Sequence, residues 1–518
     1  MRVDRAAGSP RLKRVVIDWR RRLAVSALWL GLALGGCDAS GPPSSEGQDP
    51  QAQPSVEAVP EPVHTALLEL GDPELEPFKG DLDVMEARGV VRALVAPSRT
   101  DFFLDHGRIQ GLQAELLREF ESFLNRGRAR EADRIRVKLV PVSFVELIPA
   151  LEAGKGDLVA AFLTETPQRQ DQVQIAAGMR NQVAEVLVTH DSVASPGTLD
   201  GLGGREVYLL AGSSYAEHLR QWNARAVAEG RAPIELVRAD PRLESEDILE
   251  LVHSGVVERT FVDDYKARLW ARVLPGIAIH EDVAIARDRT VGWAVRRDSI
   301  LLAEALERFT DGARGGTLLG NVLFERYFVD DRFVNDPTES SERDKLDKYL
   351  ELFERYGTRY GFEPLALAAQ AYQESHLDHS LRSPRGAVGL MQLLPTTATD
   401  TNVGIPNISE VDANVHAGAR YMAFLRDRYF SAPEIDAWNR TALALAAYNA
   451  GPRRIREART RTTELGLDPN VWFDNVEVAT GRLVGREPVR YVANIYKYFV
   501  AYRLALGREA DRRSARPQ

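Results

Sequence analysis

The fold of the second half of the chain is decided by residues 364–375, Pro364-Leu365-Ala366-Leu367-Ala368-Ala369-Gln370-Ala371-Tyr372-Gln373-Glu374-Ser375. The run that follows the proline is almost wholly apolar, and proline is favourable in the first turn of a helix. The stretch therefore predicts a buried helix that brings Glu374 to the rim of a core. Partial burial raises the pKa of a carboxyl group, which a general acid working near neutral pH requires.

Other interpretations of Glu374 are compatible with this stretch alone. A glutamate at a helix end is commonly a paired structural residue. Most glycosidases use two carboxylates, and Asp378 is the nearest second candidate, one turn after Glu374 if the helix continues that far. His376 and His379 also lie nearby, but their order does not match the zinc pattern His-Glu-x-x-His, so no metal is expected.

Several sequence blocks follow Glu374 in a fixed order. They are Ser383-Pro384-Arg385-Gly386-Ala387-Val388-Gly389-Leu390-Met391-Gln392, Pro395-Thr396-Thr397-Ala398, residues 414–421, Ala447-Tyr448-Asn449-Ala450-Gly451, and Glu487 with Tyr491-Val492. Together they resemble the catalytic domain of the soluble lytic transglycosylases over roughly residues 346–506. The resemblance implies a mainly helical, lysozyme-like fold that cleaves bacterial peptidoglycan between N-acetylmuramic acid and N-acetylglucosamine.

The resemblance also implies roles for individual residues. Glu374 matches the single acid and base of that family. Aromatic rings offer flat apolar faces to sugars, while amides and hydroxyls meet N-acetyl groups and ring hydroxyls. The implied glycan-binding residues are Ser383, Met391, Gln392, Tyr448, Asn449 and Tyr491.

With one carboxyl group, the implied reaction is a lytic transglycosylation. Glu374 would protonate the glycosidic oxygen while the acetamido group of the substrate supports the sugar cation. The muramoyl 6-hydroxyl would then close on the anomeric carbon and leave a 1,6-anhydromuramoyl end. The alternatives are a lysozyme-type hydrolase of the same bond and a non-catalytic lipoprotein that binds peptidoglycan or a solute.

Short apolar runs alternate with amphipathic stretches between residues 89 and 328, which predicts an α/β fold with a parallel sheet. The expected strands are residues 90–95, 135–139 and 157–162, and the expected helices are residues 112–123 and 144–153. The blocks Gly156-Asp157-Leu158-Val159, Thr166-Pro167-Gln168-Arg169, Gly212-Ser213-Ser214 and Phe261-Val262-Asp263-Asp264-Tyr265 resemble the family-3 periplasmic solute-binding proteins, which are two-lobed clamps.

That resemblance implies a ligand site for an amino acid or a muropeptide. Arg169 would clamp a ligand carboxylate, because a planar guanidinium suits bidentate pairing. Thr164 and Ser213 would add hydrogen bonds, and Asp263 would meet an ammonium group. The alternative is that Arg169 and Asp263 form ordinary ion pairs of the fold.

The first residues predict the cellular location of the protein. A basic stretch precedes the apolar residues 23–34, which suit a signal-peptide core, and Leu34-Gly35-Gly36-Cys37 resembles the bacterial lipobox. Cleavage before Cys37 and lipid attachment to it would anchor the protein to a membrane on the periplasmic side. Family resemblance implies the outer membrane, whereas Asp38 resembles a signal for inner-membrane retention. Cys37 is the only cysteine, so no disulfide can stabilise the chain.

These observations predict the organisation of the 518 residues. Residues 1–36 are expected to be a lipoprotein signal peptide, 37–85 a flexible tether, 86–335 the solute-binding domain, 342–507 the catalytic domain and 508–518 a disordered tail. This order resembles the membrane-bound lytic murein transglycosylases of type F. The net charge of −9 disfavours nucleic acid as a partner, and no cofactor site is evident. The expected partners are peptidoglycan glycan strands, the clamp ligand and a membrane.

Overall fold

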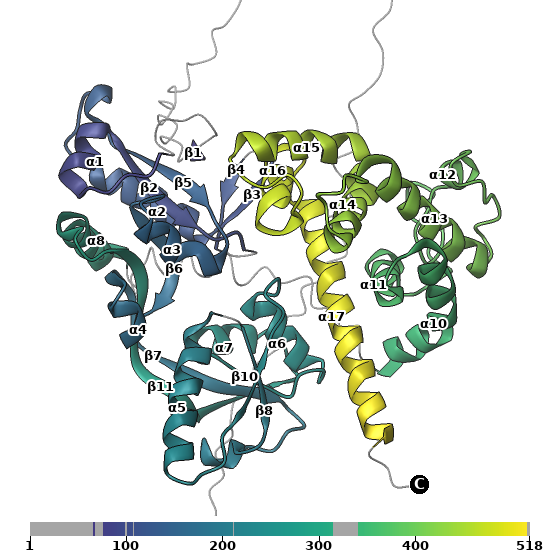
Figure 1. Ribbon diagram of the computed structural model, residues 1–518, viewed down its shortest axis with the longest axis horizontal. Coiled ribbons are helices and arrows are strands. Elements are labelled where there is room, and N and C mark those ends of the chain that lie inside the picture. The colour runs from purple at the N-terminus through teal and green to yellow at the C-terminus, as the bar shows by residue number, and fades with distance from the viewer. Residues whose placement is uncertain are drawn as a thin grey trace, which may run out of the picture. The chain divides into compact units, whose positions relative to one another are not determined.

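The computed structural model describes residues 66–67, 76–98, 101–106, 108–210, 212–313 and 340–514 (Figure 1). The expected signal peptide, Cys37 and most of the expected tether lie outside these residues. The described residues all belong to one compact unit. None of the helices within them is both long and apolar enough to cross a bilayer.

The N-terminal half is built on a seven-stranded sheet with the order β1-β5-β2-β6-β11-β7-β10. Strands β1 (Ala66–Leu67), β5 (Arg136–Pro141), β2 (Val90–Val95) and β6 (Leu158–Thr164) are parallel. Strands β7 (Val173–His190), β11 (Ile277–Arg296) and β10 (Arg259–Asp263) pair antiparallel. The sheet is therefore mixed, and the expectation of a parallel sheet is right for the first four strands and wrong for these three. A short parallel pair, β8 (Glu206–Leu209) and β9 (Glu235–Arg238), forms a separate sheet.

The long strands β7 and β11 connect two lobes. Lobe 1 comprises residues 76–178 and 291–313, and lobe 2 comprises residues 183–286. Between the lobes the pairing of β7 with β11 shifts register repeatedly, and Gln182 and Asp288 adopt positive φ angles of 58° and 54°. Bulges of this kind bend and twist strands, so the crossing redirects the sheet from one lobe into the other.

Helices cover both lobes (Figure 1). Lobe 1 carries α1 (Leu82–Arg88), α2 (Leu112–Leu124), α3 (Leu147–Glu152), α4 (Pro167–Gln170) and α8 (Ile300–Ala313), together with the hairpin β3 (Phe103–Asp105) and β4 (Arg108–Gln110). Lobe 2 carries α5 (Ser214–Ala228), α6 (Ser245–His253) and α7 (Asp264–Trp270). The expected helix at residues 144–153 is the short 3₁₀ turn Phe144–Glu146 followed by α3.

A buried ion cluster ties strands β2, β6 and β11 together in lobe 1. The backbone N–H, Nε and Nη2 of Arg92 donate hydrogen bonds to the carboxylate of Asp157 at 2.7–3.0 Å. Arg296 Nη2 lies 3.7 Å from the same carboxylate. All three side chains are buried and cannot be solvated by water. The carboxylate therefore stabilises the two guanidinium charges, and they stabilise the carboxylate.

The folded part begins before the expected end of the tether at residue 85. The backbone N–H of Phe78 donates a hydrogen bond to Gly154, and its ring lies under the guanidinium of Arg88 at 4.1 Å. Helix α1 then starts at Leu82, with Asp81 as its N-cap. Burying the large apolar ring of Phe78 against lobe 1 stabilises this segment as part of the fold.

The C-terminal half is helical, as predicted. It contains α10 (Ser340–Tyr360), α11 (Pro364–Ser375), α12 (Pro395–Thr399), α13 (Val411–Tyr429), α14 (Ala437–Ala450), α15 (Pro452–Glu464), α16 (Glu477–Leu483) and α17 (Arg486–Ser514), with a kinked turn, Trp472–Val476, before α16. Helix α11 is the central element, because its small apolar side chains let neighbouring helices approach closely. Helix α17 continues past the expected domain end at residue 507.

The C-terminal helices contact both lobes. The backbone N–H of Arg486 donates to Asp105 of the β3 segment at 3.0 Å, and its guanidinium lies 3.8 Å from the ring of Phe103. In lobe 2, Tyr496 of α17 donates a hydrogen bond to Asp240 at 2.5 Å. Lys497 pairs with Glu250 in a buried position. One helical domain therefore holds a polar contact with each lobe.

Candidate active site

Glu374 lies in the last turn of α11, as the apolar run predicted. The helix ends at Ser375, and His376 adopts the left-handed conformation with its N–H bonded to the carbonyl of Tyr372. The hydroxyl of Ser375 donates to the carbonyls of Ala371 and Leu390, which fixes the end of the helix against the following loop. The backbone under Glu374 is therefore held from two sides.

Burial raises the pKa of Glu374 to about 7. The Tyr491 hydroxyl donates a 2.5 Å hydrogen bond to Glu374 Oε1, which favours the charged form and opposes this rise. The nearby charge of Glu487 adds to the rise. Gln370, one turn earlier on α11, donates in turn to the Tyr491 oxygen at 3.4 Å. The result is a carboxyl group that can hold or release a proton near neutral pH.

Tyr448, on α14, lies within electrostatic range of Glu374 and Tyr491. Its hydroxyl donates to the carbonyl of Met391 at 2.6 Å, while the Met391 N–H donates to Asn414 at 2.9 Å. The Met391 side chain is fully buried and faces Gly418, so its predicted contact with the glycan stays a prediction. Asn414, also fully buried, positions the loop that carries Tyr448's acceptor.

The loop at residues 383–392 is held by its own hydrogen bonds. Ser383 accepts a bond from the N–H of Ala387 at 3.0 Å, and the Gln392 side chain donates to the carbonyl of Gly389 at 2.8 Å. Gly389 has φ of 77°, and a Cβ atom there would lie 2.7 Å from the amide of Asn414. Only glycine allows this approach without displacing Asn414.

Asn449 and Glu487 extend the arrangement. The Asn449 amide donates to Glu487 Oε1 at 3.3 Å. The fold thus brings Glu374, Tyr448 and Tyr491 together. Asn449 is connected to them by its hydrogen bond to Glu487, whose charge acts on Glu374. Glu487 belongs to the sequence block before Tyr491, but the sequence alone gave no sign of its effect on the acid.

Asp378 and His379 form hydrogen bonds with other groups than Glu374. Because α11 ends at Ser375, Asp378 is not on its last turn. Its exposed carboxylate accepts from the N–H and hydroxyl of Ser380, and these bonds lower its pKa. His379 Nε2 is bonded to the carbonyl of Ser409 at 2.7 Å. Asp378 is therefore a turn-capping carboxylate in the part of the chain described.

We expect two substitutions to move the pKa of Glu374 in opposite directions. Tyr491→Phe removes the hydrogen bond that favours the carboxylate, so the pKa should rise by about half a unit to one unit for a bond worth about 1 kcal/mol. Glu487→Gln removes a neighbouring negative charge, so the pKa should fall by less than that. The pH profile of kcat/KM on isolated glycan strands measures both. Shifts in the same direction would contradict this assignment.

The residues predicted to bind a ligand in the N-terminal half already have partners. Arg169 pairs with Glu217 at 3.3 Å and donates to the carbonyls of Thr164 and Gly212 at 3.1 Å. Ser213 caps α5 by accepting from the N–H of Ala216. Asp263 lies 3.6 Å from Lys266. Glu217 and Lys266 were not foreseen, because both lie outside the blocks that carry the family resemblance.

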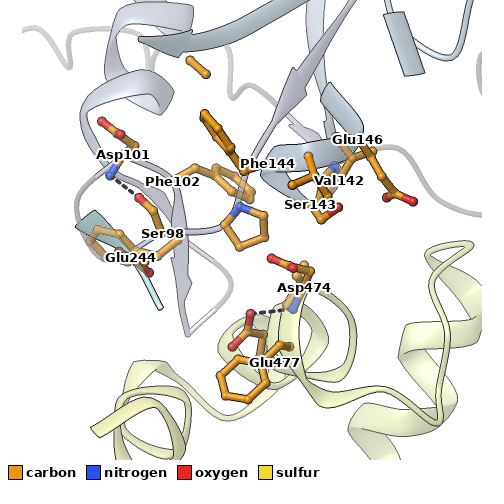
Figure 2. Close-up of a pocket in the computed structure, with 18 of the residues that line it drawn as sticks. Ser98, Asp101, Phe102, Val142, Ser143, Phe144, Glu146, Glu244, Asp474 and Glu477 are labelled. Atoms are coloured by element: carbon orange, nitrogen blue, oxygen red, sulfur yellow. Dashed lines mark hydrogen bonds between the residues drawn. The ribbon is translucent and has the colours of Figure 1, made fainter. Parts of the chain in front are cut away.

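A cavity of about 1080 Å³ is lined by residues of both lobes and by the segment around α16. Thr164, Arg169, Ser213 and Asp263 all line it, as does Lys266. Figure 2 shows another part of its wall, where Asp474 and Glu477 face Phe102, Phe144 and Glu146. Burial raises the pKa values of both carboxyl groups, and the charge of Glu146 adds to the rise for Asp474, while the charge of Asp474 adds to the rise for Glu477. The Asp474 N–H donates to Glu477 at 2.7 Å.

Two family models match the chain. Residues 351–469 match the transglycosylase SLT domain, and residues 93–358, about half the chain, match the bacterial extracellular solute-binding proteins, family 3. Both parts of the predicted fold class, a two-lobed binding-protein fold followed by a mainly helical lysozyme-like region, are thereby confirmed. The matched segments contain Glu374 and the clamp residues, respectively.

Curated relatives match about two thirds of this chain. A protein of Desulfosudis oleivorans named membrane-bound lytic murein transglycosylase F is 30% identical over 371 residues, which cover 68% of this chain and 78% of the relative. A protein of the same name from Maricaulis maris is 32% identical over 381 residues, covering 69% and 79%. Among solved structures, an ancestral arginine-binding protein bound to arginine is 22% identical with a TM-score of 0.37, covering 46% of this chain and 99% of its own.

Proposed function

The chain belongs to the membrane-bound lytic murein transglycosylase F family and is a peptidoglycan lytic transglycosylase, and from this premise we propose that Glu374 is its single acid and base. The supporting observation is a partly buried carboxyl group with a pKa of about 7, held by the hydroxyl of Tyr491. A group with this pKa is present in both protonation states near neutral pH. A single residue can therefore donate a proton in one step and accept one in the next.

The proposed substrate bond joins N-acetylmuramic acid to N-acetylglucosamine. Glu374 donates its proton to the glycosidic oxygen as the bond from that oxygen to the anomeric carbon breaks. The acetamido oxygen of the muramoyl residue bonds to the anomeric carbon and stabilises the cation. The Glu374 carboxylate then removes the proton of the 6-hydroxyl, whose oxygen displaces the acetamido oxygen. A 1,6-anhydromuramoyl end forms, water is not consumed, and Glu374 regains its proton.

The other site residues are proposed to hold the glycan. Ser383, Gln392 and Asn449 offer polar groups, and Tyr448 and Tyr491 offer ring faces beside the acid. The Tyr448 hydroxyl is committed to the Met391 carbonyl, so its ring contributes shape more than hydrogen bonding. Met391 is proposed to act through its backbone, as the acceptor that orients Tyr448.

Analysis of the products tests this proposal directly. Purified sacculi are digested with the full-length protein, and the released muropeptides are identified by mass spectrometry. We expect 1,6-anhydromuramoyl ends, which are one water lighter than reducing ends. Reducing ends as the main product would instead assign the protein to the lysozyme-type hydrolases of the same bond.

We expect activity to fall as the pH rises through about 7. The reacting form of Glu374 is the protonated one, and burial raises its pKa to about 7. Above that pH, each further unit leaves about one tenth as much protonated enzyme, so kcat/KM should decrease about tenfold per unit. Initial rates of anhydromuropeptide release between pH 5 and 9 measure the limb. A constant rate up to pH 9 would contradict the assignment.

The sequence also left open a non-catalytic peptidoglycan-binding lipoprotein, which the relatives named as transglycosylases and the SLT match do not support. Zymography in gels that contain sacculi tests the role of Glu374, with wild type beside Glu374→Ala. Clearing by the wild type alone supports Glu374 as the acid, and equal clearing by both proteins would contradict it.

The N-terminal domain is proposed to bind a small ligand, an amino acid or a muropeptide, and to influence the catalytic domain through the contacts of α17 with lobe 2. A ligand can shift activity only if its affinity differs between two conformations. Calorimetry, together with turnover at zero and saturating ligand, measures the coupling. Equal turnover would leave a domain that binds without regulating.

We further propose that Cys37 carries a lipid anchor on the periplasmic side, with the signal peptide at residues 1–36 and the two domains at about 76–335 and 342–514. The curated relatives are named as membrane-bound proteins, and the lipobox-like sequence supplies a means of attachment. Cys37→Ala should release the protein from the membrane fraction. Retention of that variant in membranes would contradict lipidation.

A further inference from the structure

We propose that Gln370 is a positioning residue for the acid. Its side-chain amide occupies the acceptor side of the Tyr491 hydroxyl and so directs the hydroxyl proton to Glu374 Oε1, which leaves Glu374 Oε2 to carry the proton given to the glycan. The inference rests on the proposed role of Glu374 and deepens it. The sequence predicted no role for Gln370 beyond its place in the buried helix α11.

Gln370 is a polar side chain in an apolar interior. It lies on α11 between Ala369 and Ala371, and none of the three is exposed to solvent. A buried amide costs free energy unless its hydrogen bonds are satisfied. Its nitrogen donates to the Tyr491 hydroxyl at 3.4 Å, while its Oε1 has no hydrogen-bond partner among the described residues. An apolar side chain of the same size would be cheaper here, so the bond to Tyr491 explains the amide better than stability does.

The hydrogen bonds around the Tyr491 oxygen have a fixed direction. A phenol has one proton, and Tyr491 donates it to Glu374 Oε1 at 2.5 Å. Burial raises the pKa of the Tyr491 hydroxyl well above its usual value, so the proton stays on the phenol. Toward Gln370 the oxygen can therefore only accept, and the amide nitrogen is the group that it faces.

The contact between Tyr491 and Glu374 could run in the opposite direction once Glu374 is protonated. The carboxyl proton would then be donated to the Tyr491 oxygen instead of the glycosidic oxygen. The Gln370 amide opposes this reversal, because it already uses the acceptor side of that oxygen. Oε1 of Glu374 therefore stays an acceptor, and the transferable proton resides on Oε2.

Two other titratable groups act on this contact from neighbouring helices. The charge of Glu487 on α17 raises the pKa of Glu374, and the electrostatic effect of Tyr448 on α14 raises that of Tyr491. Among the described residues, Gln370 is the side chain that bonds to the acceptor side of the Tyr491 hydroxyl. The two electrostatic effects are the same in every variant of residue 370, so differences between such variants report on the amide.

Two substitutions remove the amide from Tyr491 with opposite effects on stability. Gln370→Met has nearly the same length but no amide, so it should unfold at the same or a higher temperature than the wild type. Gln370→Asn withdraws the amide by one methylene, and the space left behind should lower the unfolding temperature. We expect both to lower kcat on isolated glycan strands by about threefold to tenfold at about pH 5.5, with KM unchanged.

The decrease of activity at high pH provides a second readout in the full-length protein. Without the amide, Tyr491 is a weaker donor to the Glu374 carboxylate, which favours the protonated acid. The pKa of Glu374, about 7 in the wild type, should rise in both variants by less than in Tyr491→Phe. Thr462→Val removes a buried hydroxyl from α15 of the same domain and is the matched control. It should leave kcat and the pH profile unchanged.

A double-mutant cycle shows whether Gln370 acts through Tyr491. In the Tyr491→Phe background no hydroxyl remains to be oriented, so Gln370→Met should change kcat by less than about twofold. An equal loss in both backgrounds would overturn the inference, as would wild-type kcat and pH profile in the folded variants of residue 370. If one of the two variants fails to fold, which circular dichroism reveals, the other decides.

These outcomes differ from those that would refute the proposed function. If Glu374→Gln kept the wild-type rate, the acid itself would be wrongly assigned, and with it the group that Gln370 positions. An inactive Glu374→Gln together with unaltered variants of Gln370 would leave Glu374 as the acid and refute only the positioning role.

Discussion

Glu374→Gln is expected to lower the rate of glycan cleavage by a factor of about 10² to 10⁴, the usual contribution of a positioned general acid and base. Glutamine has nearly the same shape and can still accept the hydrogen bond of Tyr491, but it has no proton to give to the glycosidic oxygen. The release of anhydromuropeptides from sacculi measures the loss. Glycan binding should persist, because the other site residues are unchanged.

The matched control for this variant is Glu363→Gln, an exposed glutamate at the opposite end of α11 whose side chain makes no capping bond. It should retain full activity. If Glu374→Gln retained more than about half of the wild-type rate, the acid would have to be sought elsewhere. The stability of Glu374→Gln should equal or exceed that of the wild type, since a partly buried carboxyl becomes a neutral amide.

Asp157→Ala is expected to destabilise lobe 1 by about 3 to 5 kcal/mol, the cost of removing one partner of a buried ion pair. The change would leave the guanidinium groups of Arg92 and Arg296 buried without the carboxylate that they share. Hydrogen exchange of the amides in β2 and β6 measures the effect locally, and their protection should fall.

Glu119→Ala serves as the control for the Asp157 variant, because Glu119 is exposed on α2 of the same lobe. Its exchange rates should match those of the wild type. Protection unchanged in Asp157→Ala would mean that the two arginines find other partners, among them the carbonyls of Glu76, Phe78 and Gly156 that already accept from them.

The spacing of apolar residues predicted those helices and strands that bury the same face along their whole length. The apolar run after Pro364 is α11, and the alternation of short runs from residue 90 gives β2, α2, β5 and β6 within one or two residues of their bounds. These segments bury whole faces, so their period is visible in the sequence. The same run predicted the place of Glu374 at the end of this helix, whereas its role as the acid was predicted from the resemblance to the soluble lytic transglycosylases and stays a prediction.

The long strands and the partners across the cleft could not be predicted in this way. Strands β7 and β11 change their buried face at the crossing near Gln182 and Asp288, so no single period runs through them. The pairing of Arg169 with Glu217 joins residues from different lobes. Contacts of this kind depend on the tertiary structure, and one sequence without relatives does not contain a local signal for them.

Helix α17 carries one contact with the proposed acid and another with lobe 2. The Tyr491 hydroxyl donates a hydrogen bond to Glu374. The hydroxyl of Tyr496, five residues later and about 7.5 Å further along the helix axis, donates one to Asp240 of lobe 2. Because backbone hydrogen bonds fix the rotation of each helical residue relative to the next, a rotation of α17 about its axis would move both tyrosines. We therefore expect a movement of lobe 2 that displaces α17 to change the hydrogen bond between Tyr491 and Glu374, and so to change the pKa of Glu374, which a titration can measure.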